Sequence, residues 1–496
     1  MRQGPLAGRY PAVAAMVVFA LAPYLVLSAS LQPIAPIIAR QLHMSAQAMN
    51  LTEGMANAAY ALGTVLSVQL AQHMRQRRML ILYAVILVIA SVLAAAATGP
   101  ALFIAGHVLQ GLCTSLLLIA AVPPLIIGYP ASRLRSTAVI MNLSIFGAVA
   151  LGPVVGGIQA EADAWRPLFW VLAAIAVAAL VLSLLTFEDA PPADRSAPWD
   201  PLAVALAAAG CIAAFFGASE LLTHRFLSSS AVVPLAVGLV LIVILLLYQY
   251  RARRPLLFVR PLASTMPVAG ITVAMCAAAA SLSAIALTGD VLQDRYSPLH
   301  VGLLYLPVLG GAVITAVGFA AVFRTRWLHY FALTGLVSLS AGIVVIGGAV
   351  PPTTALTLIG SALIGVGVGA SVAPALFIAG FSLRNGALQR VFAIVELLRA
   401  VAAFMIAPIL LHLAGTVGDS TAAGIRTALW VCLGVSGGGA LLAITLYALG
   451  GVRPPTPVLE RWFGGENPAW DSPPLLAALR RGSTRHQRSA EPRTDP

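Results

Sequence analysis

Residues 138–160 read AVIMNLSIFGAVALGPVVGGIQA and contain no charged side chain. The hydrocarbon core of a bilayer is about 30 Å thick and a helix rises about 1.5 Å per residue, so about 20 apolar residues span it. This stretch is long enough, and its second half is rich in glycine around Pro153. Small residues let helices approach closely, and an internal proline removes a backbone hydrogen bond and permits a kink. The stretch therefore predicts a membrane-spanning helix that crosses a neighbour at short distance.

Similar apolar stretches recur along the whole chain. Of its 496 residues, 60% are hydrophobic and 9% are charged, whereas a soluble domain is roughly 25% charged. This composition argues against a secreted disulfide scaffold, a disordered chain and a conventional cytosolic enzyme, and it predicts an all-α membrane protein. Fourteen runs are long enough to span, near 12–34, 50–71, 79–98, 101–124, 138–160, 166–187, 201–221, 230–249, 266–290, 299–323, 328–349, 354–381, 391–414 and 424–449.

Two polar, proline-rich stretches divide these runs. They extend from Glu188 to Pro201 and from Tyr248 to Pro267, and they bracket one pair of runs with six on either side. This arrangement suggests two similar halves with an inserted helical hairpin. We therefore expect an N-terminal six-helix bundle, a linker with the hairpin, a C-terminal six-helix bundle, and a basic cytoplasmic tail without a core of its own, at 1–187, 188–265, 266–450 and 451–496 respectively.

The charges indicate topology rather than a nucleic-acid site. All basic residues apart from histidine are arginines and the net charge is +12. Most of these arginines fall in the tail or in short loops that share a side with the N-terminus, which predicts that both termini are cytoplasmic. We expect a multi-pass protein of the bacterial cytoplasmic (inner) membrane that contacts the lipid bilayer and binds no nucleic acid.

Motifs for catalysis and cofactors are not evident in the sequence. It contains neither the GxxxxGK[ST] pattern for ATP nor an HExxH zinc pattern. The four cysteines lie inside apolar runs without the spacing of a metal site or a disulfide framework. We therefore expect no enzyme activity, no cofactor and no metal.

Several motifs resemble one family. The run Gly152-Pro-Val-Val-Gly-Gly157, which contains Pro153 and Gly156 and follows Gly147, resembles the GPxxGG motif in span 5 of antiporters of the major facilitator superfamily. The sequence from His107 to Gly111 resembles the RxxQG element of span 4, with His107 at the arginine position. The sequences DVLQ and GLLYLP, from Asp290 and from Gly302, resemble a run in the fourteen-span drug:proton antiporters.

The loop after the second run resembles the conserved loop between spans 2 and 3 of this family. It departs from the family pattern because Gln72 replaces an aspartate and Arg75 a glycine, whereas Arg77 and Arg78 keep its basic character. The missing carboxylate weakens the helix-to-helix clamp that the resemblance implies at this loop. The resemblance as a whole covers residues from about 25 to 450.

This resemblance implies the major-facilitator fold, with two six-helix bundles and two inserted central helices, and proton-coupled export of small hydrophobic or amphipathic compounds by alternating access. The implied partners are the small-molecule substrate, protons and, where two membranes are crossed, a separate periplasmic or outer-membrane protein. Alternatives are a lipid, siderophore or metabolite transporter of the same fold, and a membrane sensor or partner protein that has lost coupling. A lipid carrier should open laterally to the bilayer, whereas a drug pump should enclose a central cavity.

Four ionisable residues inside the runs are candidates for proton coupling, since a buried charge is costly unless it is paired or hydrated. Glu53 either carries the proton or extends to the outer interface. His107 either titrates, which arginine does not, or is a neutral hydrogen-bonded histidine. Glu396 and Arg399 share one helix face, as a fixed ion pair or as one that breaks between states. Asp290 is expected to face the outer loop.

Polar side chains within the apolar runs are candidates for a substrate cavity, because such cavities combine apolar walls with a few polar groups. The candidates are Gln32, Gln110, Asn142, Gln293 and Tyr305.

Overall fold

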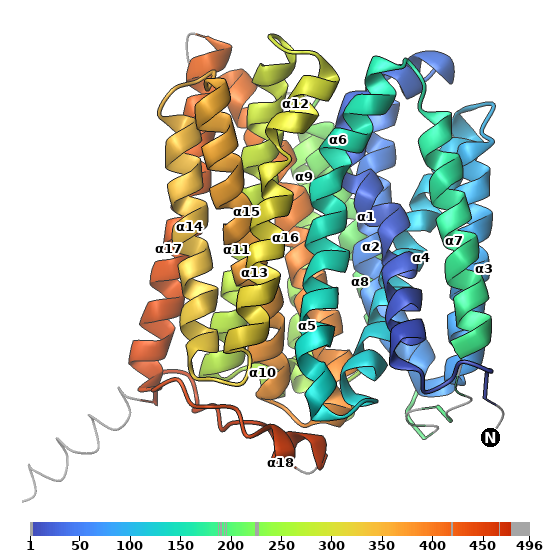
Figure 1. Cartoon of the computed structure of the whole chain (residues 1–496), viewed down its shortest axis with the longest axis vertical. Coiled ribbons are helices and arrows are strands. Elements are labelled where there is room, and N and C mark those ends of the chain that lie inside the picture. Colours follow the sequence, from blue (N-terminus) through green and yellow to red (C-terminus); the bar gives the residue numbers. More distant parts are fainter. Residues whose placement is uncertain are drawn as a thin grey trace, which may run out of the picture.

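Long apolar helices make up most of the chain in the computed structural model (Figure 1). The structure describes residues 3–477 except 187, 189–190, 193, 195, 224–227, 418–419 and 466. Within these residues, thirteen helical segments are long and apolar enough to cross a membrane. The prediction of an all-helical membrane fold is confirmed.

The N-terminal half contains six long segments, of which the fifth is continuous through a short π-helical turn, η2. Its elements are α1 (Tyr10–Gln41), α2 (Ala46–His73), α3 (Gln76–Ala95), α4 (Pro100–Ile127), η1 (Ala131–Arg133), α5 (Leu134–Asn142), η2 (Leu143–Gly147), α6 (Ala148–Glu161) and α7 (Arg166–Thr186).

An inserted pair, α8 (Pro201–Glu220) and α9 (Ser229–Arg251), follows the linker, and the short α10 (Val259–Leu262) leads into the second half. The C-terminal half contains α11 (Thr265–Gln293), α12 (Pro298–Leu304), α13 (Pro307–Val322), α14 (Trp327–Gly347), α15 (Thr354–Phe381), η3 (Asn385–Ala387), α16 (Leu388–Thr416), α17 (Thr421–Gly450) and α18 (Leu459–Phe463).

Helix α2 is the fourteenth long helix, although it is not among the thirteen apolar segments. It carries Asn50, Glu53 and Asn57, which make it less apolar than its neighbours. It nevertheless lies inside the bundle, where it packs on α4, α8 and α16. The predicted run 50–71 falls within this helix, so the expected fourteen helices are all present. The most polar long helix is thus placed at the junction of the two halves.

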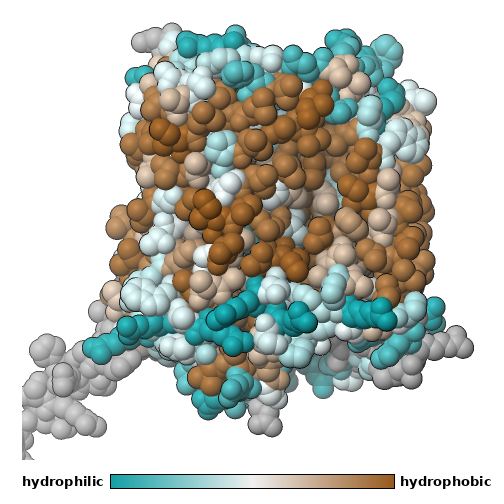
Figure 2. All heavy atoms as spheres, in the orientation of Figure 1, coloured by the Kyte–Doolittle hydropathy of each residue, from teal (hydrophilic) through white to brown (hydrophobic). Residues whose placement is uncertain are grey.

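On the face shown in Figure 2, an apolar belt lies between two polar ends. Large side chains such as Val171, Ile314 and Leu441 are more than half exposed on it, which is the pattern expected of a surface that faces lipid. The N-terminus and α18 lie at the same end of the bundle (Figure 1). We call this end the inner end and the opposite one the outer end.

The beginning of the predicted tail packs against the C-terminal half. The Trp462 indole donates a hydrogen bond to the Leu383 carbonyl at 2.9 Å, and the Trp470 indole donates to Ser382 Oγ at 2.9 Å. Both rings are buried and make edge contacts with Phe381. Residues 452–477 therefore depart from the expected coreless tail, because two large aromatic side chains anchor them. The remainder of the predicted tail lies outside the described residues.

Candidate substrate cavity

A cavity of about 520 Å³ lies between the two halves, nearer the outer end. It is lined by α1, α2, α6 and α8 on one side and by α11, α12 and α16 on the other. Leu282, Phe404 and Leu411 are among the residues of its apolar surface. Its polar lining consists of Ser28, Gln32, Asn50, Glu53, Asn57, Ser219, Asp290, Gln293 and Tyr305.

Two acidic side chains line this cavity, one from each half. Glu53 comes from α2 in the N-terminal half and Asp290 from α11 in the C-terminal half. Neither side chain forms a hydrogen bond or ion pair with any described residue. No arginine, lysine or histidine occurs among the described residues of the lining. An anionic cleft with low-dielectric walls concentrates cations.

Three of the predicted cavity residues lie together here. Gln32 of α1 faces α11, since a Cβ placed on Gly289 would be 3.6 Å from its Oε1 atom. The Tyr305 hydroxyl lies 2.5 Å from Thr288 Oγ1, which fixes the phenol against α11. Gln293, on the last turn of α11, completes the group.

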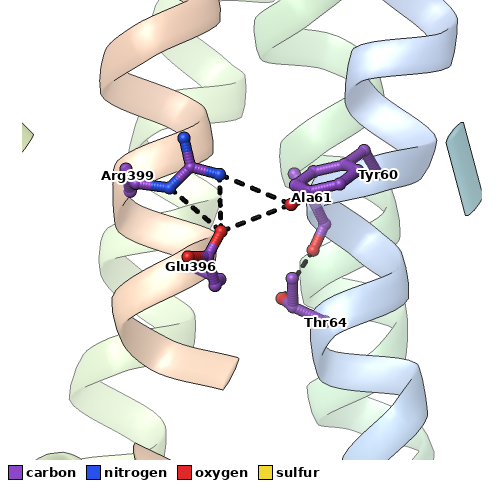
Figure 3. A network of polar contacts seen from close by, with 5 residues as sticks. All are labelled: Tyr60, Ala61, Thr64, Glu396 and Arg399. Carbon is purple, nitrogen blue, oxygen red and sulfur yellow. Dashed lines mark hydrogen bonds and ion pairs between the residues drawn. The ribbon is translucent and has the colours of Figure 1, made fainter. Parts of the chain in front are cut away.

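A buried polar network between α2 and α16 lies on the inner side of the cavity (Figure 3). The Arg399 guanidinium donates to Glu396 Oε2 from Nη2 at 2.6 Å and from Nε at 3.0 Å. The Tyr60 hydroxyl donates to the same carboxylate oxygen at 3.3 Å and accepts from Arg399 Nη2 at 3.4 Å. The predicted pair is thus within one helix, and Tyr60 provides its link to the other half.

Aromatic rings connect this network to the cavity. The Tyr24 and Tyr60 rings stack with centroids 5.8 Å apart, and the Tyr24 hydroxyl donates to Asn57 Oδ1 at 2.7 Å. Asn57 lines the cavity. Phe404, which also lines it, contacts the Tyr60 ring edge-on at 6.2 Å. Any movement of α2 relative to α16 therefore disturbs both the cavity and the buried ion pair.

The other three predicted residues of spans 4 and 5 lie away from the cavity. His107 is buried against the rings of Tyr24 and Phe103, and its Nδ1 atom has no hydrogen-bond partner among the described residues. The Gln110 amide donates to Ser91 Oγ of α3 at 3.1 Å. The Asn142 amide donates to the Gly369 carbonyl of α15 at 2.9 Å and so joins the two halves.

The glycine motif makes close helix contacts within one half and between the halves. Cβ atoms on Gly152 and Gly156 would lie 2.5 Å from the Ala29 Cβ and the Ser30 carbonyl of α1. A Cβ on Gly157 would lie 2.6 Å from the Pro298 carbonyl at the start of α12. The Pro153 carbonyl would be 2.5 Å from a Cβ on Gly302.

Gly147 differs from the other glycines of the motif. The nearest atom to a Cβ placed there would be Leu309 Cδ1 at 3.6 Å, which is ordinary contact distance. The close approach of helices therefore depends on the later part of the motif.

At the inner end, Gln72 is buried and lines a second cavity of about 340 Å³ with Asp194, Arg254 and Arg390. Hydrogen bonds from Ser196 are the main cause of a lowered pKa for the Asp194 carboxyl, with a further contribution from the charges of Arg390 and Arg254. Position 72 lacks the carboxylate of the family pattern, but the linker residue Asp194 places a carboxylate in the same cavity. The three loop arginines follow, with Arg75 directly before α3 and Arg77 and Arg78 in its first turn.

The linker is docked to the inner end of α2. His73 Nε2 lies 3.1 Å from the Ala197 carbonyl, and its ring stacks on Trp199 at 4.2 Å. Asp200 caps the first turn of α8 by accepting from the Ala203 amide, and its other oxygen accepts from Gln249 Nε2 of α9 at 2.8 Å. The inserted hairpin is thereby attached to the N-terminal half.

A sequence model of the Major Facilitator Superfamily matches residues 17–357. The chain belongs to the Major Facilitator Superfamily. Its members are transporters, in agreement with the prediction that the chain is not an enzyme. The human organic anion transporter MFSD10 (TETRAN) has the same fold, with a TM-score of 0.60 and 13% identity over 88% of this chain and 99% of that one.

Relatives within the superfamily include proteins named as efflux pumps. The drug efflux pump JefA of Mycobacterium tuberculosis is 24% identical over 61% of this chain and 60% of its own length. The multidrug efflux pump LfrA of Mycolicibacterium smegmatis is 28% identical over 56% of this chain and 55% of its own. The MFS-type transporter YubD of Bacillus subtilis is 25% identical over 56% and 59%. The matched region thus spans less than two thirds of each relative.

Sequence reasoning did not identify several residues of the site. Asn50, Asn57 and Tyr60 were not among the predicted residues, although together with the predicted Glu53 they follow one another at steps of three and four and share one face of α2. This spacing of polar residues could have indicated a face directed at the cavity and the network. Asp290, expected in the outer loop, is exposed within the cavity wall.

Proposed function

We propose that this superfamily member exports hydrophobic or amphipathic organic cations across the cytoplasmic membrane in exchange for protons. The observation that carries this proposal is the cavity between the halves, in which Glu53 and Asp290 face apolar side chains and no cationic residue is among the described lining. A lipophilic cation matches both features, since its charge is attracted by the carboxylates and its apolar part packs on residues such as Phe404. The names of JefA and LfrA as efflux pumps agree with it.

The proton and the cation would compete for Glu53. A protonated carboxyl is neutral and attracts a cation less than a carboxylate does, so proton entry would favour release of the cation. An exchanger requires that the two ligands favour different conformations or occupy one site in turn. Exchange of one proton for one monovalent cation moves no net charge, so the pH gradient drives it, at about 1.4 kcal/mol per pH unit.

We call the boundary between the two halves the seam. Alternating access would make and break the contacts at its inner and outer ends. The inner end is held by Tyr60 with the Glu396–Arg399 pair and by Asn142. The outer end is held where Gly157 contacts the start of α12. Opening to the cytoplasm would break the first set of contacts and opening to the outside the second. Positive residues at the inner end favour its assignment to the cytoplasm.

The helices beside the cavity favour a small amphipathic cation over a membrane lipid. Residues of α6 and α12 line the cavity on one side of the seam, and residues of α8 line it on the other. A lipid carrier of the same fold is expected to open laterally toward the bilayer. The walls therefore support entry from water or from the membrane surface.

Transport in proteoliposomes with an imposed pH gradient tests the proposal. We expect gradient-driven movement of a lipophilic cationic dye with the wild type, its loss with Glu53→Gln, and its retention with His107→Ala, since His107 lies outside the cavity. Asp294→Asn, an exposed aspartate that is not in the lining, is the control. Binding of the dye without gradient-driven movement in the wild type would contradict proton coupling and support the non-transporting alternative.

A further inference from the structure

The inserted hairpin lies at the seam between the two halves. Helix α8 packs along α2 and also contacts α16. His412 of α16 donates from Nδ1 to the Leu221 carbonyl at 2.6 Å, directly after the end of α8. The hairpin thus reaches from one half to the other beside the outer part of the cavity.

One face of α8 and of the turn that follows it lines the cavity. Phe215, Ala218, Ser219 and Leu222 all belong to the lining. These positions are separated by three and four residues, the spacing of one helix face. A second face of α8 is apolar and exposed, and it includes Phe216 and Leu202, which is half exposed. Helix α8 is therefore a wall with the cavity on one side and the lipid-facing surface on the other.

Helix α8 comes close to the α2 backbone at Gly54, the residue next to Glu53. A Cβ placed on Gly54 would lie 2.0 Å from Ser219 Oγ and 3.3 Å from the Phe215 carbonyl. The absence of a side chain at Gly54 therefore allows α8 to approach the α2 backbone next to the carboxylate. Ser219 Oγ donates to the Phe215 carbonyl at 2.9 Å, so its hydroxyl hydrogen is already used within α8.

We propose that the inserted hairpin is a specificity element, in which the face Phe215–Ala218–Ser219–Leu222 limits the size of the organic cation that can bind beside Glu53. This inference rests on the proposed function for the class of substrate. The cationic centre lies at the carboxylate, and the apolar substituents of the cation lie against Phe215 and Leu222. A larger side chain on this face excludes bulky cations, and a smaller one admits them.

A series of cations of graded size tests this inference. Dissociation constants for tetraethylammonium and tetraphenylphosphonium are measured by equilibrium dialysis with purified full-length protein. We expect Ala218→Leu to weaken tetraphenylphosphonium binding roughly tenfold or more while changing tetraethylammonium binding little, since one methylene of pocket space changes discrimination about 10- to 200-fold. Phe215→Ala should shift the ratio in the opposite direction. Phe216→Ala, on the lipid-facing side of α8, should leave it unchanged.

An unchanged ratio of the two dissociation constants in both Ala218→Leu and Phe215→Ala would overturn the inference. A wild type that binds neither cation would instead refute the proposed substrate class.

The position of the wall is then tested with Ser219→Cys in a background without the four native cysteines. A membrane-impermeant methanethiosulfonate added from outside should modify the cysteine of Ser219→Cys and spare that of Phe216→Cys. An unreactive Ser219→Cys would contradict the placement of this face of α8 at the cavity.

Discussion

The two ends of the seam between the halves differ in whether their charged side chains have partners. At the outer end, Glu53 and Asp290 line a cavity without a hydrogen-bond or ion-pair partner among the described residues. On the inner side, Glu396, Arg399 and Tyr60 are buried and satisfy one another. A buried charge without a partner costs several kcal/mol, so the first arrangement persists only where a cavity gives access to water or to a ligand. In the proposed transport cycle, the inner network holds the cytoplasmic side closed and the outer carboxylates bind the cation.

Removing one partner of the inner network should have the largest effect. We expect Arg399→Ala to destabilise the protein by about 3–5 kcal/mol, because it leaves the Glu396 carboxylate buried without its partner. The exposed pair Arg40–Asp163 at the outer surface is the matched comparison, and Asp163→Ala should cost less than about 1 kcal/mol. Thermal unfolding in detergent measures both variants. Equal losses of stability would contradict the account of the inner network.

Substitutions at the glycine contacts of the outer end should have the second-largest effect. We expect Gly157→Ala to reduce transport about tenfold or more, because the added Cβ pushes α6 away from the start of α12, and overpacking costs about 1–3 kcal/mol. Gly147→Ala belongs to the same motif and has space for a Cβ, so it should transport at close to the wild-type rate. Similar losses in both variants would show that helix flexibility, rather than close approach, explains the motif.

The smallest effect should come from the second cavity carboxylate. Asp290→Asn removes one negative charge that acts on the cation through a partly aqueous cavity, where a pair of charges 4 Å apart interacts by about 1 kcal/mol in water. We therefore expect cation affinity to fall about fivefold, and less at high salt. Asp294→Asn should leave the affinity within twofold. A larger loss than that of Glu53→Gln would reverse the roles of the two residues.

Sequence patterns predicted the helices better than the directions of their side chains. Hydropathy and the length of a span identify a membrane helix, but they leave its rotation about its own axis undetermined. Gln32, Gln293 and Tyr305 face the cavity, whereas Gln110 bonds to α3 and Asn142 bonds to α15. These five side chains are alike in polarity, and only their packing partners separate them.

Apolar contributions to the site could not be predicted from residue type. Ala218 and Phe215 resemble the many other apolar residues of the spans, and their place in the cavity wall depends on how α8 packs on α2. The docked part of the tail was missed for a related reason. Its polar, proline-rich composition concealed Trp462 and Trp470, whose burial requires the surface of the C-terminal half.

The most direct test of the account is proton release on cation binding. Purified protein in weakly buffered detergent solution is mixed with tetraphenylphosphonium, and the pH change is followed with an indicator dye. If a proton and the cation share Glu53, the wild type should release protons, Glu53→Gln should release none, and raising the pH should strengthen binding only in the wild type. Equal proton release by the wild type and Glu53→Gln, or cation binding without any proton release, would contradict it.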